Sequence, residues 1–279
     1  MIRTQIKKIT IIIIFSVTLL ILGVLLYSWI ISGPKKSCFD GILNQDETEM
    51  DCGGICPACV LRAKNDIRVI SSGFLESGIH NQYDIYGEIE NPNSDLGSSK
   101  FEYSFFLKDS DGTVIANKTG SGFILPGEKK YLVENNIEAL AVPKTAELEI
   151  KNTEWIRFEG YEKPQLKIVN KNYRMIDSGV GFSEATGILR NEPPFEFTVI
   201  KLQMILKDEE QNIIALNSTV INSVRSNESR EFRAFWPNRF SGEVANLEFQ
   251  ADVNIFDSES FAKKYLNPNE FQLYINKYR

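Results

Sequence analysis

The stretch Lys100–Gly112, KFEYSFFLKDSDG, decides the fold class of this chain of 279 residues. Its apolar residues alternate with polar ones, with Phe106 as the exception, which is the period of two expected for a β-strand that buries one face. The apolar set is Phe101, Tyr103, Phe105 and Leu107. Asp109 and Gly112 follow with turn chemistry, because Asp bonds neighbouring backbone and Gly adopts positive φ. The stretch predicts the first strand and turn of a β-hairpin.

The chain beyond Leu61 continues in short runs rich in Val, Ile, Tyr, Phe and Thr, separated by turn residues. Such runs are typical of strands. The strands expected in its first hundred residues are Ile67–Ser72, Tyr83–Glu90, Lys100–Lys108, Val114–Gly120, Lys129–Val133 and Ala146–Phe158. We expect a mainly β fold.

The same order of short motifs returns about a hundred residues later. The matching segments are 87–91 and 187–191, 105–109 and 204–208, 115–116 and 214–215, and 127–128 and 227–228. A period of this length with six or seven strands fits a β-sandwich. We therefore expect two tandem immunoglobulin-like β-sandwiches, residues 61–160 and 161–279 with the C-terminal tail, joined by a hinge at Glu159–Pro164. Chance similarity between two β-rich segments is the alternative.

These repeated motifs resemble the FxLYD-type domain and related immunoglobulin-like sandwiches of cell-envelope proteins. The first copy carries the G-x-x-x-N-P strand and turn, the F-x-L-x-D strand end and the P-G-E turn. Their residues are Gly87, Asn91, Pro92, Phe105, Leu107, Asp109, Pro126, Gly127 and Glu128. The second copy departs from the pattern, with Met204 in place of Phe and Ser226-Asn227 in place of Pro-Gly. The resemblance implies a fold and a spacer or adhesive role.

The apolar run Ile9–Ile31, ITIIIIFSVTLLILGVLLYSWII, contains no charged residue. A helix of this length reaches roughly 34 Å, enough to cross a hydrocarbon core of about 30 Å. Arg3, Lys7 and Lys8 precede it, so the positive-inside rule places residues 1–8 in the cytoplasm and the rest outside. We expect a retained signal anchor at residues 9–32 in a single-pass membrane protein. A cleaved signal peptide and a buried core helix are the alternatives.

The charge balance of the exported part argues against nucleic-acid binding. The chain has 31 basic and 37 acidic residues, and the first 37 residues hold five of the basic ones and no acid. The remainder therefore carries a formal charge of about −11, which repels phosphate backbones and anionic lipid. Envelope proteins, surface proteins and glycans are the partners that we expect.

All four cysteines lie in one short segment of the predicted module at residues 33–60: Cys38, Cys52, Cys56 and Cys59. An even count on the oxidising side of a membrane predicts two disulfides, with three possible pairings. A segment this short needs crosslinks or a metal to offset its chain entropy. A tetrathiolate zinc site is the alternative, although the first two cysteines are too far apart for a second close pair.

Oxygen-bearing side chains are dense between the first two cysteines. Asp40, Asn44, Glu47 and Asp51 are the candidate ligands of a Ca²⁺ ion, with Gly41, Gly53 and Gly54 allowing tight turns. The spacing of an EF-hand is absent. The same four residues also fall on one face of a short helix, so a solvated helix face is the alternative.

The whole segment resembles a cysteine module of exported bacterial and archaeal proteins, C-x-D-G-x-x-N-x-x-E-x-x-x-D-C-G-G-x-C-x-x-C. Every fixed position is filled between Cys38 and Cys59. The resemblance implies an extracytoplasmic setting and transfers no activity.

No catalytic constellation emerges from the sequence. His80 is the single histidine and lies in a predicted turn, and no phosphate loop, H-E-x-x-H or G-x-S-x-G motif occurs. Acid pairs such as Asp109 with Asp111 and Glu209 with Glu210 keep a carbohydrate-active enzyme open as a remote alternative. The tail after Asp257 is amphiphilic, and we expect a short helix capped near Ser258 or Ser260. An exposed aromatic strip that binds a partner is the alternative.

We therefore expect a membrane-anchored, non-enzymatic structural or adhesion protein. The rival is an accessory subunit of a secretion, pilus or cell-wall assembly machine.

Overall fold

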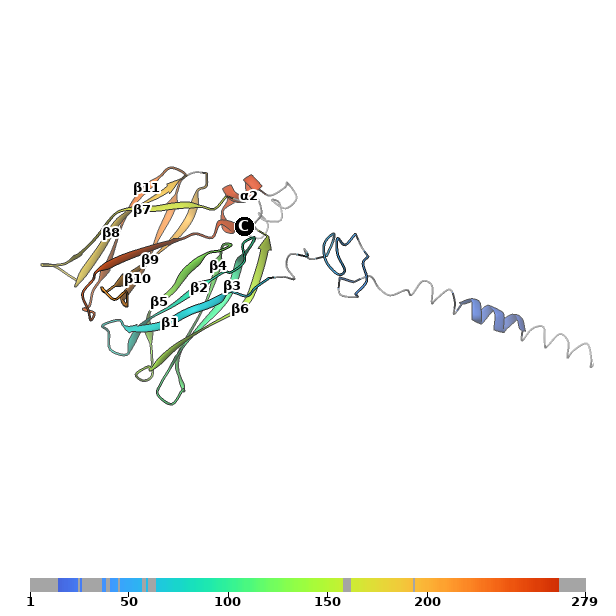
Figure 1. Ribbon diagram of the computed structural model, residues 1–279, viewed down its shortest axis with the longest axis horizontal. Coiled ribbons are helices and arrows are strands. Elements are labelled where there is room, and N and C mark those ends of the chain that lie inside the picture. Colours follow the sequence, from blue (N-terminus) through green and yellow to red (C-terminus); the bar gives the residue numbers. More distant parts are fainter. Residues whose placement is uncertain are drawn as a thin grey trace, which may run out of the picture. The chain divides into compact units, whose positions relative to one another are not determined.

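The computed structural model describes residues 15–24, 26, 37–38, 41–44, 46–56, 59, 64–157, 162–192 and 194–265 (Figure 1). The chain divides into two compact units, Met1–Ala63 and Lys64–Arg279. The first unit holds the apolar run and the cysteine module, and the second holds both β-rich halves.

In the first unit, residues 15–24 are helical, and their side chains are exposed. Among the residues that the structure describes, no helix is both long enough and apolar enough to span a membrane. The rest of the predicted anchor lies outside the described residues, apart from Leu26.

The second unit is built from twelve strands and two short helical segments within the described residues. Its first half contains β1 (Arg68–Glu76), β2 (Gln82–Glu90), β3 (Leu96–Lys108), β4 (Val114–Ile124), β5 (Lys129–Glu138) and β6 (Thr145–Arg157). Its second half contains β7 (Gln165–Met175), β8 (Ser183–Glu192), β9 (Phe197–Lys207), β10 (Ile213–Val224), β11 (Ser229–Trp236), β12 (Asn246–Asp252), the 3-10 turn η2 (Ile255–Asp257) and α2 (Glu259–Tyr265). The mainly β fold expected from the sequence is confirmed.

Each half consists of two three-stranded antiparallel sheets with the same strand order. The first half has β1-β2-β5 and β4-β3-β6, and the second has β7-β8-β11 and β10-β9-β12. The third strand of each half is central in its sheet and the second strand is central in the other. The two halves therefore share one topology.

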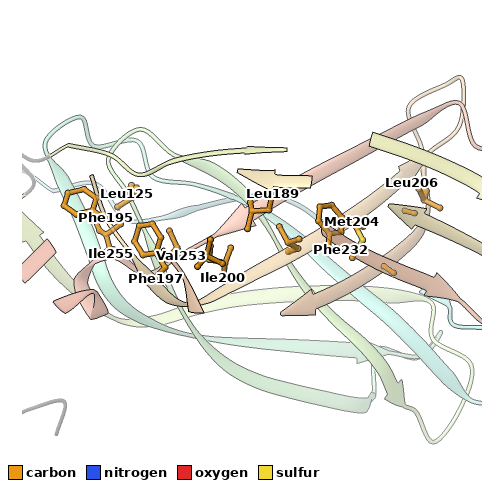
Figure 2. Close-up of a cluster of buried hydrophobic side chains, with 14 of the residues drawn as sticks. Leu125, Leu189, Phe195, Phe197, Ile200, Met204, Leu206, Phe232, Val253 and Ile255 are labelled. Carbon is orange, nitrogen blue, oxygen red and sulfur yellow. The ribbon is translucent and has the colours of Figure 1, made fainter. Parts of the chain in front are cut away.

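A separate hydrophobic core lies between the two sheets of each half. Phe101, Phe105 and Leu107 of β3 are fully buried there, as the alternation of KFEYSFFLKDSDG predicts, and they meet Ile85 and Ile89 of β2. In the second half the core joins Leu189 and Phe232 of one sheet to Met204 and Leu206 of the other (Figure 2). Burial of these faces is the main stabilising term of the sheets.

The turns that close each half share the hydrogen bonds that one asparagine amide donates. They differ at its oxygen, because Asn91 Oδ1 accepts from Asn93, whereas Asn191 Oδ1 is buried without a partner among the described residues. Asn91 is fully buried and its amide donates to the carbonyls of Leu96 and Leu125 at 2.7 and 3.0 Å. Asn191 is equally buried and donates to Phe195 and Arg225 at 2.8 and 3.0 Å. A buried amide with such partners fixes the loop that it spans. The motifs that repeat in the sequence therefore do the same structural work in both halves.

A third apolar cluster joins the two halves. Val133 of β5, Ile205 of β9 and Leu216 of β10 are buried against one another, although each points away from the core of its own half. Sheet β1-β2-β5 therefore packs on sheet β10-β9-β12, and the second unit has four layers. The predicted hinge at Glu159–Pro164 joins two halves that are already in contact; its residues 159–161 lie outside the described part of the chain.

The predicted C-terminal helix is present as α2. Ser258 Oγ accepts a hydrogen bond from the backbone N–H of Phe261 at 3.3 Å, as an N-cap does. Phe261 is 3% exposed and belongs to the core of the second half. The exposed aromatic strip considered for this tail is therefore wrong for Phe261, and residues 266–279 lie outside the described residues.

Candidate functional site

The four cysteines form two disulfides, Cys38–Cys56 and Cys52–Cys59, with Cα–Cα distances of 5.5 and 4.8 Å. The sequence predicted two disulfides and left three pairings open. In the observed pairing the second bridge closes a short loop whose residue Cys56 is held by the first. The described part of the chain contains no free cysteine. A tetrathiolate zinc site is incompatible with this state, because every sulfur is already bonded to another.

A carboxylate accompanies each disulfide. Ligand atoms of Glu47, Cys38 and Cys56 lie within 4.8 Å of one another, and the same holds for Glu49, Cys52 and Cys59. One Glu47 oxygen is 3.2 Å from the sulfur of Cys56. Disulfide sulfurs are poor metal ligands compared with thiolates, so these groups place negative charge beside the bridges rather than complete a thiolate site.

The four candidate calcium ligands have different positions in the structure. Asp40 lies outside the described residues. Glu47 Oε2 accepts hydrogen bonds from the backbone N–H groups of Asn44 and Asp51, each at 3.1 Å, and Asp51 Oδ1 accepts one from Gly41 at 2.8 Å. Within residues 41–44 and 46–56 the chain forms turns and one isolated bridge, so the helix-face alternative is wrong there.

These contacts show how so short a segment is held. Positive φ at Gly41, Asp51, Gly53 and Gly54 lets the chain turn sharply. Carboxylate oxygens satisfy backbone N–H groups that have no strand or helix to join. The acidic residues Glu47 and Asp51 therefore have a structural use in holding these turns.

A second polar site lies at the junction between the two halves. Lys130 Nζ of β5 is 3.7 Å from Asp252 Oδ1 of β12, and their side chains are 2% and 7% exposed. The ammonium also lies 3.7 Å from the ring centroid of Phe123. Because both charges are removed from water, each depends on the other for stability.

Two glutamines complete this junction. The Asp252 Oδ2 atom accepts hydrogen bonds from Gln203 Nε2 at 2.8 Å and from Gln250 Nε2 at 2.7 Å. Gln250 also bonds the backbone N–H and C=O of Tyr131 at 2.7 and 2.9 Å. One side chain thus connects the charged pair to the edge of the neighbouring sheet.

Two glutamates at equivalent turns carry opposite pKa shifts. Glu128 accepts a hydrogen bond from the N–H of Leu125, and Glu228 accepts the corresponding bond from Arg225. Burial raises the pKa of Glu128, whereas the backbone hydrogen bond from Arg225 and the neighbouring Arg230 lower the pKa of Glu228. The difference arises because the first turn lies near the junction and the second lies in solvent.

The residues considered for catalysis lie in turns. His80 is exposed in the loop between β1 and β2. Asp109 Oδ1 accepts backbone hydrogen bonds from Asp111 and Thr113, each at 2.9 Å, and Asp208 Oδ1 accepts one from Asn212 at 2.8 Å. Both aspartates thus close hairpin turns, the role that the turn motif predicts.

No family model matches this chain, and no curated protein matches it. Solved structures with some similarity include a transglutaminase of red sea bream, with 10% identity and a TM-score of 0.22. The match covers 69% of this chain and 32% of the transglutaminase. They also include the calcium binding domain CBD12 of CALX1.1 (10% identity, 66% of this chain, 79% of that one, TM-score 0.18). A third is the N-terminal CBM22-1-CBM22-2 tandem domain from Paenibacillus barcinonensis Xyn10C. Its identity is 7%, the match covers 67% of this chain and 85% of that one, and the TM-score is 0.15. At these TM-scores the similarities carry no argument about this chain.

Proposed function

We propose that this chain is a non-enzymatic interaction protein, held at a membrane by its N-terminal apolar run, that presents two immunoglobulin-like, FxLYD-related sandwiches on the extracytoplasmic side. The two disulfides support this location, because such bonds persist in oxidising compartments. The acidic composition supports partners other than nucleic acid.

The observation that carries the proposal is the docking of the two sandwiches. Val133, Ile205 and Leu216 bury an apolar surface between them, and the Lys130–Asp252 pair is enclosed beside it. Two sandwiches fixed in this way present their outer sheets and loops in one arrangement, which reduces the ordering cost of engaging a partner with both. The two disulfides similarly hold the cysteine module, which precedes the sandwiches in the chain.

The location is tested by labelling single cysteines introduced into the full chain. Ser110→Cys lies at an exposed hairpin tip and Gln5→Cys lies in the predicted cytoplasmic segment. A membrane-impermeant maleimide added to intact cells should label the first variant and leave the second unlabelled until the cells are lysed. The reverse pattern, or a labelled protein that fractionates with the cytosol, would overturn the proposed topology.

The interaction role is tested by photo-crosslinking in the native membrane. A photoreactive residue is placed at Ser110 and, in a separate variant, at Glu209 in the equivalent turn of the second sandwich. Both variants should form a reproducible adduct with the same envelope or surface component. Adducts with subunits of an export or cell-wall machine would favour the rival function. Hydrolysis of envelope glycan by the purified chain would contradict the non-enzymatic reading.

A further inference from the structure

A cavity of about 150 Å³ lies between the two sandwiches, away from the buried ion pair. From the first sandwich it is lined by the β1–β2 loop, by Asp84 of β2 and by Asn135 and Asn136 of β5. From the second it is lined by β10, by the end of β11 and by the following loop through Phe240. A cavity of this volume accommodates a six-membered ring.

The walls of this cavity are held by contacts between the sandwiches. Ser218 Oγ donates to Asn135 Oδ1 at 2.9 Å, and Asn238 Nδ2 donates to the carbonyl of Ser77 at 3.4 Å. Gly78, with φ of 78°, approaches so closely that an added Cβ would lie 2.3 Å from Cβ of Asn238. The cavity is therefore part of the docked arrangement and exists before any ligand arrives.

Its lining combines planar amides with aromatic rings. Asn135, Asn136, Asn217 and Asn238 contribute amide groups. Trp236 and Phe240 contribute rings that meet edge to face with centroids 6.4 Å apart. Amides and carboxylates form paired hydrogen bonds with neighbouring hydroxyl groups, and aromatic rings pack against apolar C–H groups. A ring-shaped molecule with both hydroxyl and C–H groups can bond the amides and pack against the aromatic rings.

Asp84 adds a carboxylate that the amide of Asn135 and the backbone of Asn136 hold at the cavity. Its Oδ1 accepts a hydrogen bond from the backbone N–H of Asn136 at 2.9 Å, and within the described residues it forms no ion pair. Burial raises the pKa of this carboxyl group. A partly desolvated carboxylate facing a cavity is stabilised by a ligand that donates hydrogen bonds to it.

We propose that this cavity binds one pyranose ring of a neutral glycan, with Asp84 and the asparagine amides bonding its hydroxyls and the aromatic wall contacting its C–H face. The inference rests on the proposed interaction function and gives it a ligand class. Arg239, at the cavity and exposed, is placed to contact the next sugar along the chain.

The test uses saturation-transfer NMR on the full chain with the methyl pyranosides of glucose, galactose, mannose and N-acetylglucosamine, and with tetramethylammonium as a cationic probe. We expect transfer to the ring protons of at least one pyranoside, with a dissociation constant in the millimolar range. Asp84→Asn should weaken this binding about tenfold or more, since a hydrogen bond to a charged group is lost. Asp111→Asn, at an exposed turn, is the matched control and should leave it unchanged.

A second variant tests position rather than charge. Ile79→Trp enlarges an exposed loop residue at the cavity and should abolish the signal, whereas Val114→Trp, at an exposed position of β4, should not. Absence of transfer from every pyranoside, equal binding by Asp84→Asn, or binding of the ammonium ion alone would each overturn the proposal. If the photo-crosslinks persist while no pyranoside binds, only the glycan site fails and the interaction function stands.

Discussion

Gln250 of the second sandwich bonds both the backbone N–H and the backbone C=O of Tyr131 in the first, at 2.7 and 2.9 Å. Tyr131 lies on β5, an edge strand whose other side pairs with β2. A single glutamine thus takes the place of a neighbouring strand for one residue. An unpaired edge is a site for unwanted strand pairing, and this contact covers it while joining the two sandwiches.

Gln250→Ala should destabilise the chain by about 1–3 kcal/mol, because two backbone groups at the junction lose their partners. Chemical denaturation measures the change in the free energy of unfolding. Gln165→Ala, at an exposed position at the start of β7, is the control and should change it by less than about 0.5 kcal/mol. Equal effects of the two substitutions would show that the Tyr131 contact does not contribute.

Lys130→Met should lower the free energy of unfolding more than the removal of an exposed lysine does. The substitution leaves Asp252 buried without its cation, which costs about 3–5 kcal/mol. Lys151→Met breaks the pair with Glu149, whose side chains are 60% and 48% exposed, and should cost less than about 1 kcal/mol. Thermal unfolding of the two variants at one salt concentration checks this, and a small change for Lys130→Met would contradict a dry junction.

Glu128→Gln and Glu228→Gln should have opposite effects on stability at neutral pH. The pKa of Glu128 is raised in the folded state, so its ionisation opposes folding once the pH exceeds the unfolded pKa. The pKa of Glu228 is lowered, so its ionised form stabilises the fold above the unfolded pKa, and this contribution is lost as the pH falls through the folded pKa.

Melting temperatures at pH 7 and at pH 3 test this pair of predictions. At pH 7, Glu128→Gln should raise the melting temperature and Glu228→Gln should lower it. At pH 3 both differences should shrink, because most of the carboxyl groups are then protonated in the unfolded chain. Shifts of the same sign at pH 7 would contradict the assigned causes.

Glu47→Gln should make the Cys38–Cys56 disulfide easier to reduce with an anionic thiol. The Glu47 carboxylate, 3.2 Å from the Cys56 sulfur, repels an incoming anion, and a charge interaction at this range in water corresponds to about a fivefold change in rate. Non-reducing peptide mapping after timed exposure to mercaptoacetate measures the rate. Cysteamine, whose ammonium group offsets the charge of its reactive thiolate, should show a smaller change, and Glu243→Gln should change neither rate.

Local signals predicted the strands and turns well. The alternation of Phe101, Tyr103, Phe105 and Leu107 reports a strand with one buried face, and Asp109 closes the turn that its position predicts. These features depend on residues a few positions apart. The matched roles of Asn91 and Asn191 follow from the repeat, which is also readable in the sequence.

The junction could not be predicted in this way. Lys130 and Asp252 are far apart in the chain, and neither stands out from the other charged residues of an acidic protein. The outer-face residues Gln203 and Ile205 of β9 are buried, whereas their counterparts Ser104 and Phe106 in β3 are half-buried. Each pair has one polar and one apolar residue, so the sequence does not distinguish the covered strand from the other. The disulfide pairing likewise depends on the three-dimensional path of the loop rather than on spacing.

The two sandwiches are docked into one body through Val133, Ile205 and Leu216. Spin labels at Lys151→Cys of β6 and Arg190→Cys of β8, read by double electron–electron resonance on the full chain with its disulfides intact, measure this directly. Docked sandwiches should give a single narrow distance distribution, which broadens in the Lys130→Met variant. A broad distribution in the unmodified junction would show that the sandwiches move independently and would contradict the docking.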